Sequence, residues 1–410
     1  MNRYDPCIAN KIIDGTQMTV AWHVDDLKVS HKKLSAIREF VALLNDEFGK
    51  ETPISESYGK KHEYLGMQMD YSVPGEVSIS MEDYIRLVLQ EAPEDMGGMA
   101  ATPASGCLFR VNPSNANKLT GAKKDAFVHV VMQLLYLSQR ARPDIRTAIS
   151  FLCGRLHHPD TDDYKKVARV VKYLRGTADL PLRLQGDGSG AVKWYVDASY
   201  AVHPDMKGHT GGTMTLGKGS VYSTSTKQKL VARSSTESEV IGVHDVLPQA
   251  IWTANFLKDQ RFKVEQSVLY QDNMSSILLK KNGRSSSSKR TRHMDIRFFF
   301  IKDRVASKEV RIEYRPTGDM IADFFTKPLQ GRQFYKLRDQ VMNIDSNSKY
   351  HSNHMSVLKL DDDYSGEKLP DEDKTNGCGG ASWLGEEDET NWPNDVARTT
   401  YKDALVKSKE

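Results

Sequence analysis

The feature of this sequence that most constrains its fold is an apolar segment, residues 193–200, that carries a single acid, Asp197. Its Trp, Tyr and Val residues favour a pleated, half-buried surface, so the segment predicts a buried strand. One acid at the end of a strand is a weak signal, but three more acids follow in matching contexts. Glu239 begins a helical pattern, Asp272 ends another apolar strand pattern, and Asp323 lies in a further helical pattern. We interpret these four carboxylates as one metal site.

Charge is distributed unevenly along the chain, although its net value is only +3. The residues from Asp345 onward carry a net charge of −7, so the preceding body carries +10. A basic body suits a polyanionic partner, although solvated surface charge explains the same values. The four cysteines have no paired spacing, which favours a reducing compartment over a disulfide framework. No apolar run approaches the ~20 residues of a membrane span, so no membrane partner is expected.

Near the N-terminus, two adjacent acids interrupt the apolar segment 18–29. A turn signal, Asp14-Gly15, precedes this segment and predicts a β-hairpin of two short strands. The acids themselves, Asp25 and Asp26, have two interpretations. Burying both carboxylates requires a cation or a metal, whereas a tight hairpin turn leaves them in water. The residue types alone favour the two interpretations about equally.

Two helical patterns follow. Apolar residues recur at helical spacing over residues 34–48, which predicts a helix packed into the core. Residues 123–156 predict a helical hairpin that turns at Arg142-Pro143, with Asp144 as a candidate helix cap.

The segment His23-Val24-Asp25-Asp26 resembles the aromatic-x-Asp-Asp motif of reverse transcriptases, in the form found in copia-type LTR retrotransposons. Further segments are similar to that family's motifs and follow in its order: residues 62–67, 80–85, 102–103, 142–145, 158–159 and 170–177. So many motifs in the right order argue against a chance match. The chain thus resembles the C-terminal portion of a copia-type Pol polyprotein. The resemblance implies a truncated palm and thumb in residues 1–105 and a helical connection region in residues 106–185.

The departures from the family concern polymerase chemistry. The family's first polymerase aspartate lies well upstream of the Asp-Asp pair, and neither Asp5, before a proline, nor Asp14, in the predicted turn, matches it. His23 also replaces the usual tyrosine. Two-metal phosphoryl transfer needs a third ligand to bridge the ions. We therefore expect that this chain alone is not a polymerase, and that Asp25 and Asp26 are a remnant motif unless another polypeptide supplies the missing half.

Residues 190–345 predict a second unit of mixed α/β (α+β) class. The expected order of strands and helices, β-β-β-α-β-α-α-β-α, resembles the ribonuclease H fold, a mixed five-stranded sheet with flanking helices. The last of these helices carries Asp323. Five motifs resemble the copia-type ribonuclease H domain: Asp-Ala-Ser, Ser-Ser-Thr-Glu-x-Glu, Gln-Asp-Asn, Arg-His-x-Asp-Ile and Ala-Asp-x-x-Thr-Lys.

This resemblance implies a role for each acid. Asp197 would be shared by two Mg²⁺ ions, Glu239 and Asp272 would hold one ion, and Asp323 would hold the other. Mg²⁺ prefers hard oxygen ligands, Mn²⁺ can substitute for it, and two ions about 3.5–4 Å apart serve both ends of an in-line displacement at a phosphodiester. Glu237 competes with Glu239, but residues two apart on a helix face different ways. The apolar pair that follows Glu239 favours Glu239, as in the family.

Six residues are candidate contacts to an RNA–DNA hybrid: Lys289, Arg290, Arg292, His293, Ser199 and Asn273. The basic side chains suit phosphates. Ser199 and Asn273 could bond 2′-hydroxyls, which distinguish RNA from DNA. Cellular and retroviral ribonucleases H place a mobile histidine after the last strand, whereas His293 precedes that strand, as in the copia pattern. It either touches the scissile region or simply starts a helix.

The sequence as a whole predicts a ribonuclease H attached to a truncated reverse transcriptase region that is inactive as a polymerase. The acidic tail, residues 346–410, is expected to be disordered because it has few apolar residues. The expected partners are an RNA–DNA hybrid and the missing N-terminal reverse transcriptase portion. The expected location is the cytoplasm, within a virus-like particle, or the nucleus, and not the secretory route. The alternative is a retrotransposon relic that binds nucleic acid without cutting it.

Overall fold

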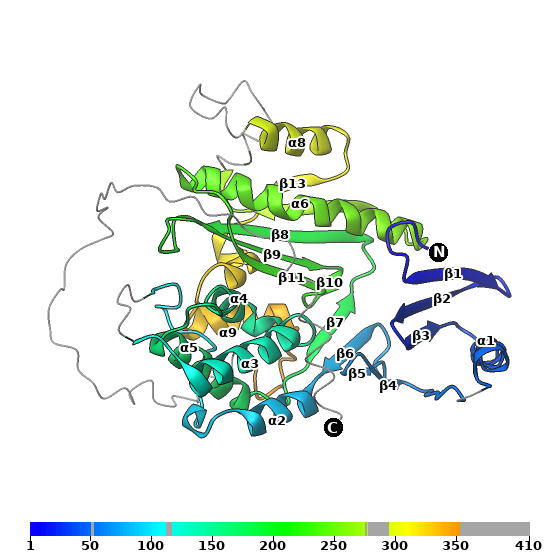
Figure 1. Ribbon diagram of the computed structural model, residues 1–410. Coiled ribbons are helices and arrows are strands. Elements are labelled where there is room, and N and C mark those ends of the chain that lie inside the picture. Colours follow the sequence, from blue (N-terminus) through cyan, green and yellow to red (C-terminus); the bar gives the residue numbers. More distant parts are fainter. Residues whose placement is uncertain (51–52, 112–116, 275–276, 278–294, 353–410) are drawn as a thin grey trace, which may run out of the picture. The chain divides into compact units, whose positions relative to one another are not determined.

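The computed structural model of the chain describes residues 1–50, 53–111, 117–274, 277 and 295–352 (Figure 1). Within these residues the strands form three sheets, of three, five and five strands, and helices accompany them. The predicted mixed α/β class is therefore confirmed. Residues 278–294, the residues beyond 352 and the features predicted for them lie outside the described residues.

The N-terminal sheet is an antiparallel meander of three strands: β1 (Ile8–Ile13), β2 (Thr16–His23) and β3 (Asp26–Ser30). Asp14 and Gly15 join the first two strands with φ angles of 49° and 71°, the left-handed conformation that a tight hairpin turn requires. The prediction of two strands here was wrong by one. The chain turns a second time at Val24, whose φ is 53°, so the Asp-Asp pair begins a new strand.

Helix α1 (Leu34–Phe48) forms where its apolar spacing predicts it, but it is not packed into a core. Ala36 is its one buried residue, and the side chains of Leu43 and Phe48 are 65% and 72% exposed. The prediction of core packing was therefore wrong. The helical spacing of apolar residues predicts an amphipathic helix. It does not predict whether other described residues cover the apolar face.

The second sheet is antiparallel throughout, in the order β10-β7-β6-β5-β4. Its strands are β4 (Lys61–Tyr64), β5 (Met67–Asp70), β6 (Glu76–Ser80), β7 (Leu182–Gly186) and β10 (Gly217–Lys218). Strand β7 comes after the helical region, and β10 comes from within the third sheet's part of the chain. This sheet therefore joins segments that are far apart in the sequence.

Helices fill the chain between β6 and β7. They are α2 (Glu82–Glu91), the short 3₁₀ turns η1 (Glu94–Met96) and η3 (Pro143–Ile145), α3 (Gly121–Ser138), α4 (Arg146–Cys153) and α5 (Thr161–Gly176). The hairpin of α3 and α4 turns at Arg142-Pro143, as predicted. Asp144 does not cap a helix, however: it accepts hydrogen bonds from the buried Arg142 guanidinium at 2.9 and 2.7 Å and from the Tyr173 hydroxyl at 2.6 Å. A buried guanidinium needs such a carboxylate partner, which overrides capping.

The third sheet has the order β11-β9-β8-β12-β13. Its strands are β8 (Ala191–Ser199), β9 (His209–Thr215), β11 (Tyr222–Lys227), β12 (Gln266–Gln271) and β13 (Arg311–Tyr314). Strand β9 is antiparallel to both of its neighbours, β8 and β11, whereas β8, β12 and β13 run parallel. Helix α6 (Ser235–Asp259) contacts β8 and β9, and α8 (Asp295–Ala306) contacts α6. The predicted mixed five-stranded sheet with flanking helices is thus confirmed.

The segment that carries Asp323 differs from its prediction. It is a five-residue 3₁₀ helix, η7 (Ile321–Phe325), preceded by η6 (Thr317–Asp319) and followed by α9 (Gly331–Met342). Two features keep η7 short. Pro328 cannot donate a backbone hydrogen bond, and three successive carbonyl groups, those of Phe324, Phe325 and Thr326, accept hydrogen bonds from other segments.

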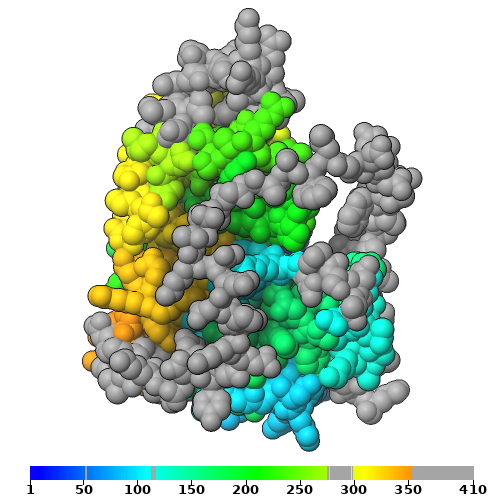
Figure 2. Space-filling model, turned by 90° about the vertical axis from the view of Figure 1, so that its left-hand side faces the viewer, coloured from blue at the N-terminus to red at the C-terminus, as the bar shows by residue number. Residues whose placement is uncertain are grey.

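Two large hydrophobic cores hold the chain together. One lies on the third sheet, around Trp194 of β8 and Val243 of α6. The other joins the helical region to the C-terminal segments: it contains Phe127 and Val170 together with Phe325 of η7 and Phe334 and Leu337 of α9. Figure 2 shows the orange residues of this C-terminal part beside cyan and green residues of the helical region.

Candidate metal centre

The centre is built on β8, the middle strand of the third sheet. Strand β8 pairs with β9 on one side and β12 on the other, so Asp197 near its end lies inside the sheet and is only 3% exposed. One carboxylate oxygen accepts a hydrogen bond from the Thr326 hydroxyl. The Lys327 ammonium lies 3.5 Å from the same oxygen. A buried carboxylate needs partners of this kind.

Helix α6 places the second acid. Ser234 caps the helix by accepting a hydrogen bond from the backbone N–H of Glu237 at 3.2 Å. One turn further, Glu239 points back to the sheet: one of its oxygens accepts from the Gln271 amide at 2.9 Å, and the other accepts from the backbone N–H of Ala198 at 3.3 Å. The competing acid, Glu237, accepts from the backbone N–H of Arg233 at 2.8 Å.

The third acid follows β12. Strands β8 and β12 are parallel, so their carboxyl ends meet at one edge of the sheet, and the residue after β12 comes close to Asp197. That residue is Asp272, which is half-buried. Its carboxylate accepts a hydrogen bond from the Thr317 hydroxyl of η6 at 2.8 Å.

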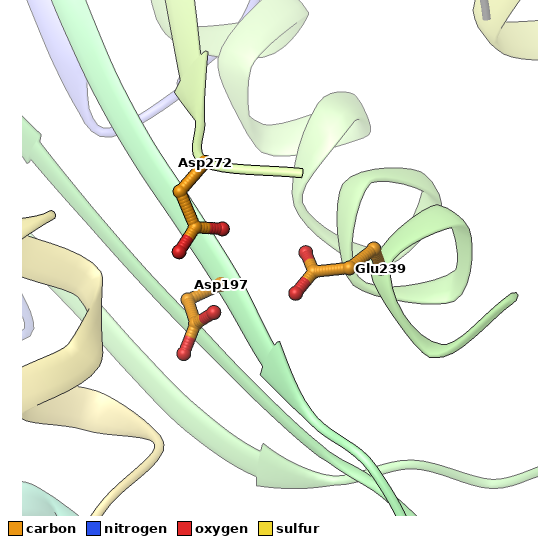
Figure 3. A group of neighbouring side chains, drawn as sticks. All are labelled: Asp197, Glu239 and Asp272. Atoms are coloured by element: carbon orange, nitrogen blue, oxygen red, sulfur yellow. The ribbon is translucent and has the colours of Figure 1, made fainter. Parts of the chain in front are cut away.

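Asp197, Glu239 and Asp272, which we call the acidic triad, point toward one another (Figure 3). One oxygen from each lies within 4.8 Å of those of the other two. Of the described residues, these three form the one group whose donors could surround a metal ion. Three carboxylates at this spacing repel one another, and the hard oxygen donors that they offer fit a cation such as Mg²⁺.

Asp323, on η7, lies beside the acidic triad and not within it. Burial, and next the neighbouring charge of Asp197, raise the pKa of Asp323 to about 7. Lys327 acts in the opposite direction, because its ammonium contacts the Asp323 carboxylate at 2.8 Å. Asp323 therefore interacts with one member of the acidic triad, Asp197.

Lys327 is a site residue that the sequence reasoning missed. Burial alone would lower its pKa, but the charges of Asp197 and Asp323 raise it, so the side chain stays cationic. It contacts both acids and compensates part of their charge. The signal was present, since Lys327 ends the Ala-Asp-x-x-Thr-Lys motif, but a lone lysine is usually interpreted as solvent-facing.

The residues predicted to contact nucleic acid are placed as follows. Lys289, Arg290, Arg292 and His293 lie outside the described residues. The Ser199 hydroxyl is buried and donates to the carbonyl of Thr326 at 3.1 Å. Asn273 directly follows Asp272 and is half-buried. Their contacts to a hybrid stay predictions.

The Asp-Asp pair of the N-terminal sheet, Asp25 and Asp26, is not part of the acidic triad. Val24 and Asp25 form the turn between β2 and β3, and both Asp25 and Asp26 are exposed. The structure thus has the tight hairpin turn, the second of the two interpretations. Among the described residues, no further acid joins this pair to complete a metal site.

Two other findings bear on the chain as a whole. In the part of the chain that the structure describes, no helix combines the length and the apolar character needed to cross a bilayer. No protein-family model matches the sequence.

Several curated proteins are similar to the chain. The retrovirus-related Pol polyprotein from transposon TNT 1-94 of Nicotiana tabacum is 27% identical over 343 residues, which is 82% of this chain. The Pol polyprotein from transposon RE1 of Arabidopsis thaliana is 26% identical over 78% of the chain. The chain spans 25% and 21% of the lengths of these two relatives. A transposon Ty5-1 protein of Saccharomyces cerevisiae is 28% identical over 54% of the chain and 70% of its own length.

Proposed function

Because the chain is homologous over most of its length to part of the copia-type retrotransposon Pol polyproteins, we propose that it is a ribonuclease H that cleaves RNA in RNA–DNA hybrids. The observation that supports this proposal is the acidic triad at the carboxyl edge of a β11-β9-β8-β12-β13 sheet. Apart from the short β10, the strands of this sheet and helix α6 follow one another along the chain in the order that the ribonuclease H resemblance implies.

The proposed cofactor is Mg²⁺, with Mn²⁺ as a substitute. The acidic triad would hold one ion, and Asp197 and Asp323 would hold a second. When bound, the ions supply Lewis acidity at the phosphodiester. The chemistry of the donor set supports this assignment, because it consists of carboxylates alone.

The chain's own residues orient the acids. Gln271 and the backbone N–H of Ala198 hold the Glu239 carboxylate, and Thr317 holds that of Asp272. Lys327 offsets the repulsion between Asp197 and Asp323. Donors that are already in place cost no reorganisation when the substrate arrives. The carboxylates are thus preorganised to bind the cations, which would in turn bind the polyanionic substrate.

The test is cleavage of a labelled RNA–DNA hybrid in Mg²⁺ by the wild type and by Asp272→Asn. We expect metal-dependent cleavage that falls by at least about 100-fold in the variant, because an amide loses the charge that binds the ion. Asp303→Asn is the matched control, since Asp303 lies on α8 with its side chain 68% exposed. Equal cleavage by Asp272→Asn and wild type would refute the assigned ligand.

The second candidate function is a relic that binds nucleic acid without cutting it. The basic charge of the body favours it, because charge alone supports binding. A well-folded wild type that binds the hybrid in Mg²⁺ and in Mn²⁺ but cuts in neither would establish the relic and refute the nuclease.

For the reverse transcriptase region we propose no polymerase activity in this chain alone. The exposed hairpin that carries Asp25 and Asp26, without a third acid beside it in the described residues, supports this proposal. Primer extension by the purified chain would contradict it. The RNA–DNA hybrid and an N-terminal reverse transcriptase portion as partners, and the cytoplasm or nucleus as location, stay predictions.

A further inference from the structure

Three side-chain hydroxyls hold three consecutive backbone carbonyls at the segment that carries Asp323. Thr147 donates to the carbonyl of Phe324 at 2.8 Å, Ser225 to that of Phe325 at 2.8 Å, and Ser199 to that of Thr326 at 3.1 Å. All three donors are buried, with exposed fractions of 8%, 1% and 9%. Burial leaves water little access to such bonds, so each one helps to fix the position of its carbonyl.

The three hydroxyls come from three different elements. Ser199 ends β8, Ser225 lies on β11, and Thr147 lies on α4, in the helical region that precedes the third sheet. Within a helix, a threonine hydroxyl can bond to a carbonyl of its own preceding turn. Thr147 instead reaches a carbonyl 177 positions along the chain. Helix α4 is also tied to β11, because the Ser150 hydroxyl donates to the Ser225 carbonyl.

The fixed carbonyls lie directly beside two of the acids. Phe324 follows Asp323, and Thr326 is the residue whose hydroxyl contacts Asp197. The next residue is Lys327, which contacts both of these acids. A displacement of the segment would therefore move Asp323, Thr326 and Lys327 together relative to Asp197.

We propose that Thr147, Ser225 and Ser199 are positioning residues that fix Asp323 and Lys327 against Asp197, and that helix α4 thereby completes the metal centre. This inference rests on the proposed function for its catalytic consequence, but its structural consequence is independent of cleavage. Partners that orient metal ligands in this way affect metal affinity by roughly 10–100-fold. Thr147 is the informative residue, because it lies outside the sheet that carries the acidic triad.

The experiment compares Thr147→Val, which keeps the shape but removes the donor, with Thr147→Ser, which keeps the donor. The first measurement is Mn²⁺ binding to the full chain, followed by electron paramagnetic resonance. We expect Thr147→Val to weaken binding by about tenfold and Thr147→Ser to restore it to near the wild-type value. Thr253→Val is the matched control: Thr253 is also buried, and its hydroxyl bonds to the Gln249 carbonyl within α6.

The second measurement is hybrid cleavage over a range of Mg²⁺ concentrations. We expect the half-saturating Mg²⁺ concentration to rise about tenfold in Thr147→Val, with the KM for the hybrid unchanged. Wild-type metal affinity and Mg²⁺ dependence in a folded Thr147→Val variant would overturn the proposal. If Thr147→Val does not fold, Ser225→Ala, which removes the hydroxyl that holds the Phe325 carbonyl, takes its place with the same expected and contrary results.

If the chain is not a nuclease, the same two measurements give a different combination of results. A wild type that binds Mn²⁺ but does not cut, combined with the loss in Thr147→Val and its recovery in Thr147→Ser, would refute the nuclease and support the positioning role.

Discussion

At the scale of single residues, the site is a balance between clustered carboxylates and one lysine. Asp197, Glu239 and Asp272 come within 4.8 Å of one another, and Lys327 bridges Asp197 to Asp323. Without a cation this arrangement would be self-repelling. Lys327 therefore stabilises the fold as well as the site.

We predict that Lys327→Met destabilises the metal-free protein at pH 8. Removing one partner of a buried pair costs about 3–5 kcal/mol, but the Lys327 side chain is 40% exposed, so we expect roughly 1–2 kcal/mol. Denaturant unfolding in EDTA measures this free energy. Lys327→Arg, which keeps the charge, should lose much less, and an unchanged stability of Lys327→Met would show that the lysine does not compensate the acids.

The four acids could be predicted from the sequence, because each occurs within a motif whose order matches a known family. The geometry of the fourth could not. The sequence assigns Asp323 to a second ion through the shared Asp197, and the structure places Asp323 beside Asp197, but the sequence did not predict that Lys327 contacts both acids. Spacing along the chain does not record which side chains a turn brings into contact.

At the scale of elements, a line of hydrogen bonds ties β9 and β11 to η7. The ring of His203 contacts His209 at 3.0 Å, and His209 contacts the Ser225 hydroxyl at 2.7 Å. Ser225 donates its one hydroxyl proton to Phe325, so its oxygen accepts from His209 Nε2. Burial lowers the pKa of both histidines and keeps the rings neutral at pH 7, so His209 Nδ1 carries no proton and accepts from His203 Nε2.

This line predicts a pH dependence of stability. Burial lowers the pKa of His203 to about 4 and that of His209 to about 3, both below the 6.5 of an unfolded histidine. Lys227 and Lys207 also oppose the protonation of His203, whereas Asp205 favours it. The unfolded chain thus binds more protons below pH 6.5, so stability falls as the pH falls from 6.5 toward the folded values.

We expect a loss of up to about 2 kcal/mol per histidine between pH 7 and pH 5, from 1.36 kcal/mol per unit of pKa. Denaturant unfolding across this range measures it, and His209→Gln should reduce the slope, because glutamine does not titrate. A slope that is the same in the variant would assign the loss to other groups.

The predicted helix around Asp323 shows why element prediction failed here. Residues 318–327 have a helical pattern, and the segment does turn, but its carbonyls are held by hydroxyls from α4, β8 and β11. Long-range hydrogen bonds of this kind leave no periodic signal. In contrast, the start of α6 could be predicted, because Ser234 and Glu237 form a local cap.

At the scale of the whole molecule, the largest hydrophobic core crosses the predicted boundary near residue 185. Phe334 of α9 is 3% exposed and contacts Tyr173 of α5, with ring centroids 5.9 Å apart. The same core contains Phe325 of η7. Contacts between segments so distant in sequence could not be predicted from local patterns, so the helical region and the C-terminal segments were expected to be separate.

We therefore predict that Phe334→Ala destabilises the protein by about 3–5 kcal/mol, and that the helical region and the third sheet melt together. Differential scanning calorimetry of the full chain tests both points. Phe262→Ala, at a side chain that is 63% exposed, is the control and should melt like the wild type. Two separate transitions, of which the substitution shifts only one, would contradict the shared core.

The three hydroxyls that hold η7 also bear on how copies of mobile elements are judged. Genomes accumulate mutated copies, and intact acids are a natural criterion for a surviving nuclease. In this chain a single change at Thr147, more than 120 positions before Asp272, would leave every acid intact and still loosen the site. To judge which copies keep an active nuclease, the residues that carry the hydroxyls at positions 147, 199 and 225 should therefore be examined together with the four acids.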